Sequence, residues 1–138
     1  MPCRLTPFAP ARLAALCIAA LSVAGCGFVE PATAIRNRFD QFSRHLVRGE
    51  FDLCIPFVDP IEVKSIGTEG VKFKLKLVQG VLQIAKLTEK DIRCDKVELG
   101  ADGKSAAVFW SSQFNGKWQA AHPVRWMNVD GEWYASLQ

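Results

Sequence analysis

Two hairpin turns near the carboxyl end limit the fold of this chain more than any other feature of its sequence. Asn115-Gly116 and Asp130-Gly131 suit two-residue turns between antiparallel strands, because both positions of such a turn need positive φ. They predict a curved antiparallel four-stranded meander, with strands at 91–99, 104–114, 117–128 and 132–137. Successive side chains of each strand then alternate between an inner and an outer face.

Counting back from the two turns predicts which side chains share a face of the sheet. The pairing places Phe109 opposite His122 and Trp126 opposite Ala135. The predicted inner face, against the helices, consists of Phe109, Trp118, His122, Val124, Trp126, Trp133 and Leu137. The predicted outer face consists of Trp110, Phe114, Arg125, Met127 and Tyr134. Pro123 offers no N–H to the ladder, and a bulge there would reverse the parity before it.

Helical periodicity occupies the region before the strands. A stripe of apolar residues predicts an amphipathic helix over 32–48 that ends at Gly49: Ile35, Phe39, Phe42 and Leu46. A short second helix is expected to hold Phe51, Cys54, Ile55 and Val58. The range 68–87 fits both a strand and a helix, and its length without a turn signal favours a helix. Helices followed by an antiparallel sheet give an α+β fold.

The amino-terminal segment has the layout of a secretory signal. Arg4 and Arg12 precede an apolar run at 13–24, and small residues then lead into Cys26. As a helix the run would rise about 18 Å, which is too short for a hydrocarbon core of about 30 Å. The sequence Val-Ala-Gly-Cys at 23–26 resembles the lipobox of bacterial lipoproteins.

The lipobox resemblance implies cleavage before Cys26 and attachment of lipid to its thiol. The expected organisation is a signal peptide at 1–25, a lipidated tether at 26–30 and one domain at 31–138. The mature protein would be anchored in the cell envelope on the periplasmic side. Gly27 replaces the aspartate associated with inner-membrane retention, which favours the outer membrane in a host with two membranes.

Three features of the domain are informative when taken in order. They are the aromatic stripe of the first helix, the joint Arg48-Gly-Glu-Phe-Asp52, and the terminal segment Trp126-Met-Asn-Val-Asp-Gly-Glu-Trp-Tyr134. Together they resemble the nuclear transport factor 2-like superfamily, especially its secreted and lipoprotein members. The resemblance implies a curved sheet wrapped around helices as a cone, often with an apolar pocket and often dimeric. The segment Lys72-Phe-Lys-Leu-Lys76 departs from the family, and its lysines would spread around a helix axis.

Three functional hypotheses follow. The first is non-enzymatic binding of a small apolar ligand or a partner protein, with a candidate pocket of Phe109, Trp118, His122, Trp126 and Trp133, although large aromatics also simply fill cores. The second, implied by the superfamily, is an isomerase or dehydratase that uses His122 with Asp59 or Asp40. The third is an interaction module, forming a homodimer or an envelope complex, whose exposed face carries Trp110, Phe114, Met127 and Tyr134.

The cysteine content and the net charge limit the kinds of site that the domain can contain. Cys54 and Cys94 would remain after lipidation, either as a disulfide or as two buried free thiols. No spacing typical of metal ligands is present, so neither a metal nor a cofactor is expected. Of the 17 Lys and Arg, Arg4 and Arg12 lie in the signal, which leaves 15 against 14 Asp and Glu. This balance provides no electrostatic footprint for nucleic acid.

Overall fold

The structure is a computed structural model that describes residues 29–138. The predicted signal peptide and Cys26 lie outside the described residues. The helices come first in the chain: α1 (Pro31–Arg48), α2 (Phe51–Cys54), the 3₁₀ turn η1 (Ile55–Phe57) and α3 (Pro60–Ile84). A second 3₁₀ turn and five strands follow: η2 (Glu89–Asp91), β1 (Ile92–Leu99), β2 (Ser105–Phe114), β3 (Lys117–Ala120), β4 (Val124–Val129) and β5 (Glu132–Ala135). The α+β prediction is confirmed.

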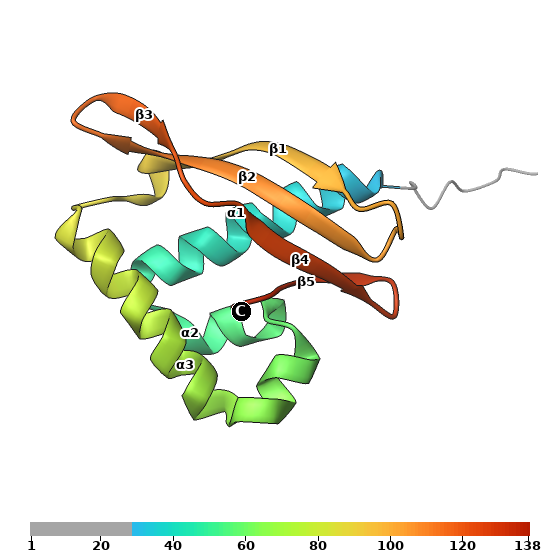
Figure 1. The fold of residues 1–138 in the computed structure, drawn as a ribbon. Helices are drawn as coiled ribbons and strands as arrows, with labels where there is room; N and C mark the ends of the chain where they lie inside the picture. Colours follow the sequence, from blue (N-terminus) through green and yellow to red (C-terminus); the bar gives the residue numbers. More distant parts are fainter. Residues whose placement is uncertain (1–28) are drawn as a thin grey trace, which may run out of the picture.

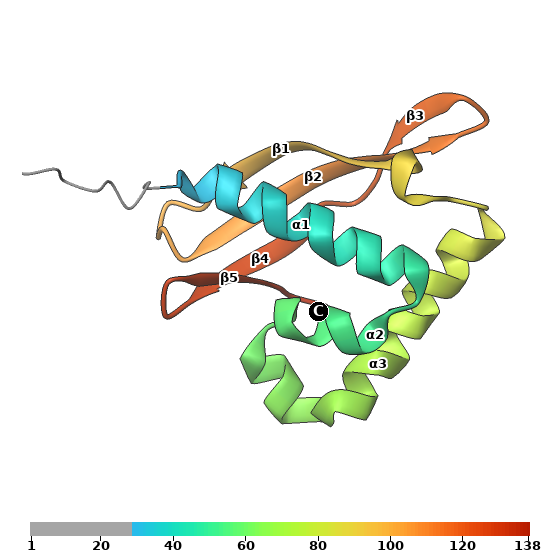
Figure 2. The same cartoon turned by 180° about the vertical axis from the view of Figure 1, so that it is seen from behind.

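The helices lie on one side of the sheet. Figures 1 and 2 show α1 running across one sheet face, with α2 and α3 on the same side and farther from the strands. Among the helices of 29–138, none combines the length and apolar composition that a bilayer crossing requires.

The sheet has five strands, where the sequence predicted four. Its order is β1-β2-β4-β5, and β3 pairs with the carboxyl-terminal half of β2 alone. The predicted strand at 117–128 is therefore two strands, separated by residues 121–123. Pro123 explains the interruption, because it has no N–H to contribute to a ladder.

The strand pairing confirms both predicted turns, but the register between β2 and β4 differs from the prediction. Trp126 lies opposite Ala135, as predicted from Asp130-Gly131. The Asn115-Gly116 hairpin also has the predicted pairing. Beyond the pair Ser111 and Ala120, the predicted pairing of Phe109 with His122 is absent from the ladder, and Val124 pairs with Val108, because the interruption at 121–123 shifts the register by one residue. The prediction that Phe109 faces inward is therefore wrong, since a shift of one residue exchanges the two faces.

A bulge on the other side of β2 has a matching effect. Cys94 pairs with Trp110, and Lys96 pairs with Phe109, so Asp95 is the extra residue of β1. As a result, the buried Cys94 and the groove-facing Trp110 share the inner face, while Lys96 and Phe109 share the outer one.

The first helix forms as its sequence predicts. Pro31 occupies its first turn, where the missing N–H costs nothing. Gly49 ends it in the left-handed conformation, at φ 71°. The buried residues of α1 are those of the predicted stripe: Ile35, Phe39, Phe42 and Leu46.

The third helix begins earlier than predicted and is bent. Asp59 caps it at Pro60, with its carboxylate accepting a hydrogen bond from the Ile61 N–H at 2.9 Å. Gly67 has φ 74° and ψ 165°, which only glycine adopts readily. The helix therefore turns sharply in Figure 1, and the predicted range 68–87 corresponds to the part after the bend.

The core lies between α1, the second part of α3 and the inner face of the sheet. The Phe42 and Trp126 rings pack edge to face, with centroids 6.4 Å apart. The buried apolar residues of the described part all lie from Ile35 to Ala135. A chain that starts at Val29 therefore contains this entire core.

Candidate functional site: an apolar groove beside α3

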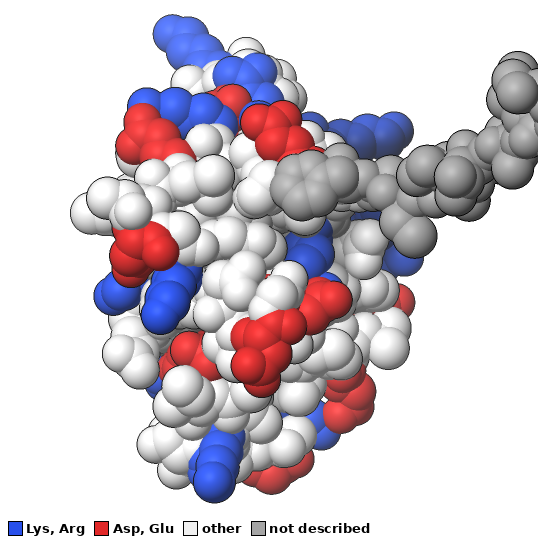
Figure 3. All heavy atoms as spheres, turned by 90° about the vertical axis from the view of Figure 1, so that its right-hand side faces the viewer, with Lys and Arg blue, Asp and Glu red and all other residues white. Residues whose placement is uncertain are grey.

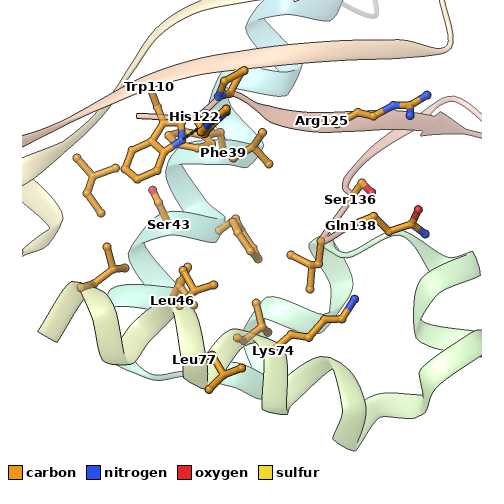
Figure 4. A pocket seen from close by; sticks show the side chains of 18 residues that line it. Phe39, Ser43, Leu46, Lys74, Leu77, Trp110, His122, Arg125, Ser136 and Gln138 are labelled. Carbon is orange, nitrogen blue, oxygen red and sulfur yellow. Dashed lines mark hydrogen bonds between the residues drawn. The ribbon is translucent and has the colours of Figure 1, made fainter. Parts of the chain in front are cut away.

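An open groove of about 550 Å³ separates the second part of α3 from α1 and the sheet. Its helical walls are mainly apolar, with Phe39, Phe42 and Leu46 of α1 and Leu75, Leu77, Val78 and Leu82 of α3 beside the polar Ser43 and Lys74. Figure 4 shows Leu46 and Leu77 on the helical side and Trp110 and His122 across from them. The groove has the volume and lining of a small-molecule site.

The sheet contributes a fixed aromatic wall. The Trp110 Nε1–H donates a hydrogen bond to the carbonyl oxygen of His122 at 2.8 Å. The Trp110 ring also lies 6.3 Å from the Phe39 ring, measured between centroids. The indole is thus held at both its polar and apolar ends, which fixes its position in the wall of the groove.

A buried carboxylate lies beside the groove. Glu62 is only 4 % exposed, and its Oε1 lies 2.6 Å from Nζ of Lys74, which lines the groove. Its Oε2 accepts a hydrogen bond from the Leu137 N–H at 2.9 Å. The ion pair places the Lys74 amine at the end of the groove that also holds Arg125, Ser136 and Gln138 in Figure 4.

The five residues of the predicted pocket are not together. His122 lines the groove. Trp126 and Trp133 are buried in the core next to it, at 0 % and 6 % exposure. Phe109 and Trp118 lie on the outer face, where Lys96 and Arg93 cover their rings at 4.4 Å and 4.1 Å. Two tryptophans thus fill the core while the groove beside them stays open.

The three predicted catalytic residues are also separated. Asp59 is engaged as the cap of α3. Asp40 borders a different cavity with Arg36 and Arg44, where burial raises the pKa of its carboxyl against the opposing effect of the two arginines. Among the described residues, no Asp or Glu side chain lines the groove together with His122.

The four residues of the predicted interaction face also lie in different parts of the domain. Met127 and Tyr134 lie opposite each other on β4 and β5. Trp110 faces the groove instead of the outer surface, because of the shifted register. Phe114 lies 45 % exposed at the end of β2, beside the Asn115-Gly116 turn.

Both cysteines of the described domain are buried free thiols. Burial raises the pKa of Cys54 to about 12, and burial also raises that of Cys94. Within residues 29–138, no three His, Cys, Asp or Glu side chains are grouped as metal ligands would be.

Sequence reasoning missed most of the groove, although one signal was present. Leu75, Val78 and Leu82 have helical spacing, and all three line the helical wall. The residues of the opposite wall, on the sheet, were predicted wrongly because the register shift brings Trp110 inward in place of Phe109.

Comparison with known proteins rests on structure alone. No family model matches the sequence, and no curated protein matches it. A crystal structure from Campylobacter jejuni, of a protein provisionally named an NTF2-like transpeptidase, superimposes with a TM-score of 0.56. The alignment covers 74 % of this chain and 96 % of that one, at 17 % identity. The fold is nuclear transport factor 2-like.

A second solved structure is less similar. It is the solution structure of a SEC-C motif containing protein from Rhodopseudomonas palustris, with a TM-score of 0.40 and 17 % identity over 77 % of this chain and 74 % of that one. In the present chain, which has the nuclear transport factor 2-like fold, the groove opens between the bent α3 and the inner face of the sheet.

Proposed function

We propose that this domain binds a small, largely apolar ligand in the groove, and that lipid on Cys26 anchors it in the cell envelope. The observation that carries the binding proposal is the groove itself. Seven apolar side chains from two helices face a fixed indole across about 550 Å³. Core filling does not account for this space, since Trp126 and Trp133 fill the core beside it.

The arrangement of polar groups suggests the shape of the ligand. Lys74 and His122 lie among the lining residues, whereas the walls between them are hydrocarbon and aromatic ring. A ligand with an apolar body and a hydrogen-bond acceptor at one end would match this distribution. The isomerase or dehydratase alternative has no comparable support, because His122 is not brought together with Asp40 or Asp59.

Filling the groove provides the test of binding. Ser43 lies on the α1 wall, and its hydroxyl donates only to the nearby Asp40 carbonyl, so its replacement costs little stability. We expect residues 29–138 to bind the fluorescent fatty acid cis-parinaric acid. Ser43→Phe should weaken binding at least tenfold by occupying the groove, while Ser43→Ala should stay within twofold. Equal affinity of the two variants, or no binding by the unmodified domain, would contradict the proposal.

The anchor is tested separately. In the host, the full chain should incorporate radiolabelled fatty acid, and Cys26→Ser should abolish the label. The labelled protein should fractionate with the outer membrane if the host has two membranes. Continued labelling of Cys26→Ser would refute lipid attachment at this residue without affecting the groove proposal.

A further inference from the structure

The second part of α3 has two apolar faces, and only one of them packs on the domain. Val71, Leu75 and Leu82 are buried against the core. Four other residues form a stripe at helical spacing and are exposed by 63, 59, 66 and 86 %: Phe73, Leu77, Val81 and Ile84. At about 100° per residue, the two sets lie about 150° apart around the axis. The stripe is thus an independent surface and not the edge of the core.

The exposed stripe continues onto the sheet. Ile84 and Phe114 line the same cavity, of about 640 Å³, between the end of α3 and the turn that follows β2. Figure 1 shows this end of the β2–β3 hairpin above the carboxyl end of α3. We call the combined surface of Phe73, Leu77, Val81, Ile84 and Phe114 the apolar ridge. A continuous exposed apolar surface of this kind usually marks an interaction site.

The charged residues beside the ridge are mostly lysines, although Asp91 also lines the cavity shared by Ile84 and Phe114. The sequence contains no Asp or Glu from Gly70 to Thr88. Lys76 and Lys86 flank the stripe, and Lys117 pairs with Phe114 across the hairpin. None of these three lysines forms a salt bridge within the described part of the chain. By contrast, Figure 3 shows acidic and basic side chains interspersed on a face turned away from this part of α3.

We propose that the apolar ridge docks on the surface of an anionic lipid bilayer. Exposed apolar side chains flanked by lysines have the chemistry of an interfacial amphipathic helix, in which the apolar stripe enters the headgroup region and the amines meet lipid phosphates. A second copy of the chain is a poorer occupant, because a two-fold contact through the ridge would bring lysines against lysines.

This surface is distinct from the groove, although the two adjoin. Leu77 belongs to both, at the rim of the groove and in the ridge. Docking would therefore turn the groove toward the lipid. It requires neither a ligand in the groove nor lipid on Cys26, and Val81 and Ile84 do not line the groove.

Vesicle binding tests the apolar contribution. Residues 29–138, which contain the entire described core, should co-sediment with vesicles of phosphatidylglycerol and phosphatidylcholine. Binding should fall with phosphatidylcholine alone or at high salt. Val81→Ser with Ile84→Ser should reduce partitioning at least tenfold. The matched control, Ile61→Ser with Leu99→Ser, removes two exposed apolar residues outside the ridge and should stay within twofold.

The charged contribution has its own matched pair. Lys76→Gln with Lys86→Gln should weaken partitioning by about fivefold per lysine. Lys64→Gln with Lys104→Gln removes the same charge away from the ridge and should have less than a twofold effect. Equal losses in the two pairs would mean that net charge alone drives binding, and would overturn docking through the ridge.

Three other outcomes would overturn the proposal. They are the absence of binding to anionic vesicles, equal losses in the two serine pairs, and a dimer by light scattering that Val81→Ser with Ile84→Ser makes monomeric. The last result would assign the ridge to a second copy. The ridge variants should still bind cis-parinaric acid, and Ser43→Phe should still bind vesicles, so that failure of the ridge and failure of the groove are distinguishable.

Discussion

The buried carboxylate of Glu62 accepts a hydrogen bond from the backbone N–H of Leu137, 75 residues later in the chain, at 2.9 Å. Its other oxygen lies 2.6 Å from Nζ of Lys74. Glu62 precedes the bend of α3 at Gly67, and Lys74 follows it. One side chain therefore joins both parts of the bent helix to the segment after β5, and so fixes one end of the groove.

Removal of this carboxylate should be costly. Glu62→Ala leaves a buried N–H and an amine without their acceptor, so we expect the free energy of unfolding to fall by about 3 kcal/mol. Glu69→Ala is the control, because Glu69 is 85 % exposed in its side chain and pairs with Lys72 at the surface. Its effect should stay below about 1 kcal/mol. Urea denaturation of both variants checks this, and similar losses would contradict the role of Glu62.

Two glycines of α3 should respond to alanine in opposite directions. Gly67 has φ 74° and no neighbouring atom near a Cβ, so Gly67→Ala is strained by its backbone alone, by about 1–3 kcal/mol. Gly80 is helical and equally free of contacts, so Gly80→Ala should stabilise the domain by about 0.5–1 kcal/mol. Thermal unfolding of the pair measures both signs. A stabilising Gly67→Ala would mean that α3 can straighten.

Arg38 should be difficult to replace even by lysine. Its guanidinium donates to the carbonyl oxygens of Trp133 at 2.6 Å and Pro56 at 3.1 Å, which joins α1 to β5 and to η1. It also lies over the Phe57 ring, 4.8 Å from the centroid. Because an ammonium group cannot reproduce this planar fork, Arg38→Lys should destabilise the domain by about 1–3 kcal/mol.

Arg44 provides the comparison for Arg38. It is more exposed, and its ion pair with Glu89 spans 3.5 Å. Arg44→Lys should change the free energy of unfolding by less than about 0.5 kcal/mol. If the two substitutions have equal effects, the contacts of Arg38 contribute little beyond its charge.

The Cys54 thiol should make stability depend on pH in the alkaline range. Burial raises its pKa to about 12 from a reference value of 9.0. A raised pKa in the folded state gives stability that is present below pH 9.0 and is lost as pH rises toward 12. The free energy of unfolding should therefore decline over this window in the unmodified domain and less steeply in Cys54→Ala.

Alkylation gives an independent check of the same thiol. At pH 8.5, iodoacetamide should modify Cys54 of residues 29–138 slowly in buffer and readily in urea, because the thiolate is the reactive form. Mass spectrometry locates the label. A species that resists alkylation in urea until it is reduced would indicate a disulfide with Cys94, contrary to the free thiols described above.

The sequence predicted those parts of the fold that depend on local signals. The stripe of α1 and its end at Gly49 follow from periodicity and from a left-handed cap. The pairing of Trp126 with Ala135 follows from the tight turn between β4 and β5, whose geometry fixes the register.

The strand register far from a tight turn could not be predicted in the same way, because each bulge or interruption shifts the pairing. The interruption at 121–123 adds one residue, and that single residue brings Trp110 to the groove and Phe109 to the outer face. The helix was predicted from residue 68 onward because proline can end a helix as well as begin one, whereas Pro60 occupies the first turn after the Asp59 cap. Of the predicted pocket only His122 lines the groove, because the register shift removes Phe109 from the inner face and brings in Trp110.

The interruption between β3 and β4 also has an evolutionary consequence. On either side of β2, the neighbouring strand contains one departure from regular pairing, at Asp95 and at 121–123. A relative that lost one residue from 121–123 could keep every aromatic amino acid of β2 and still present a different one to the groove. Among related chains, the length of this short connection should therefore predict the lining of the groove better than the identity of the tryptophans does.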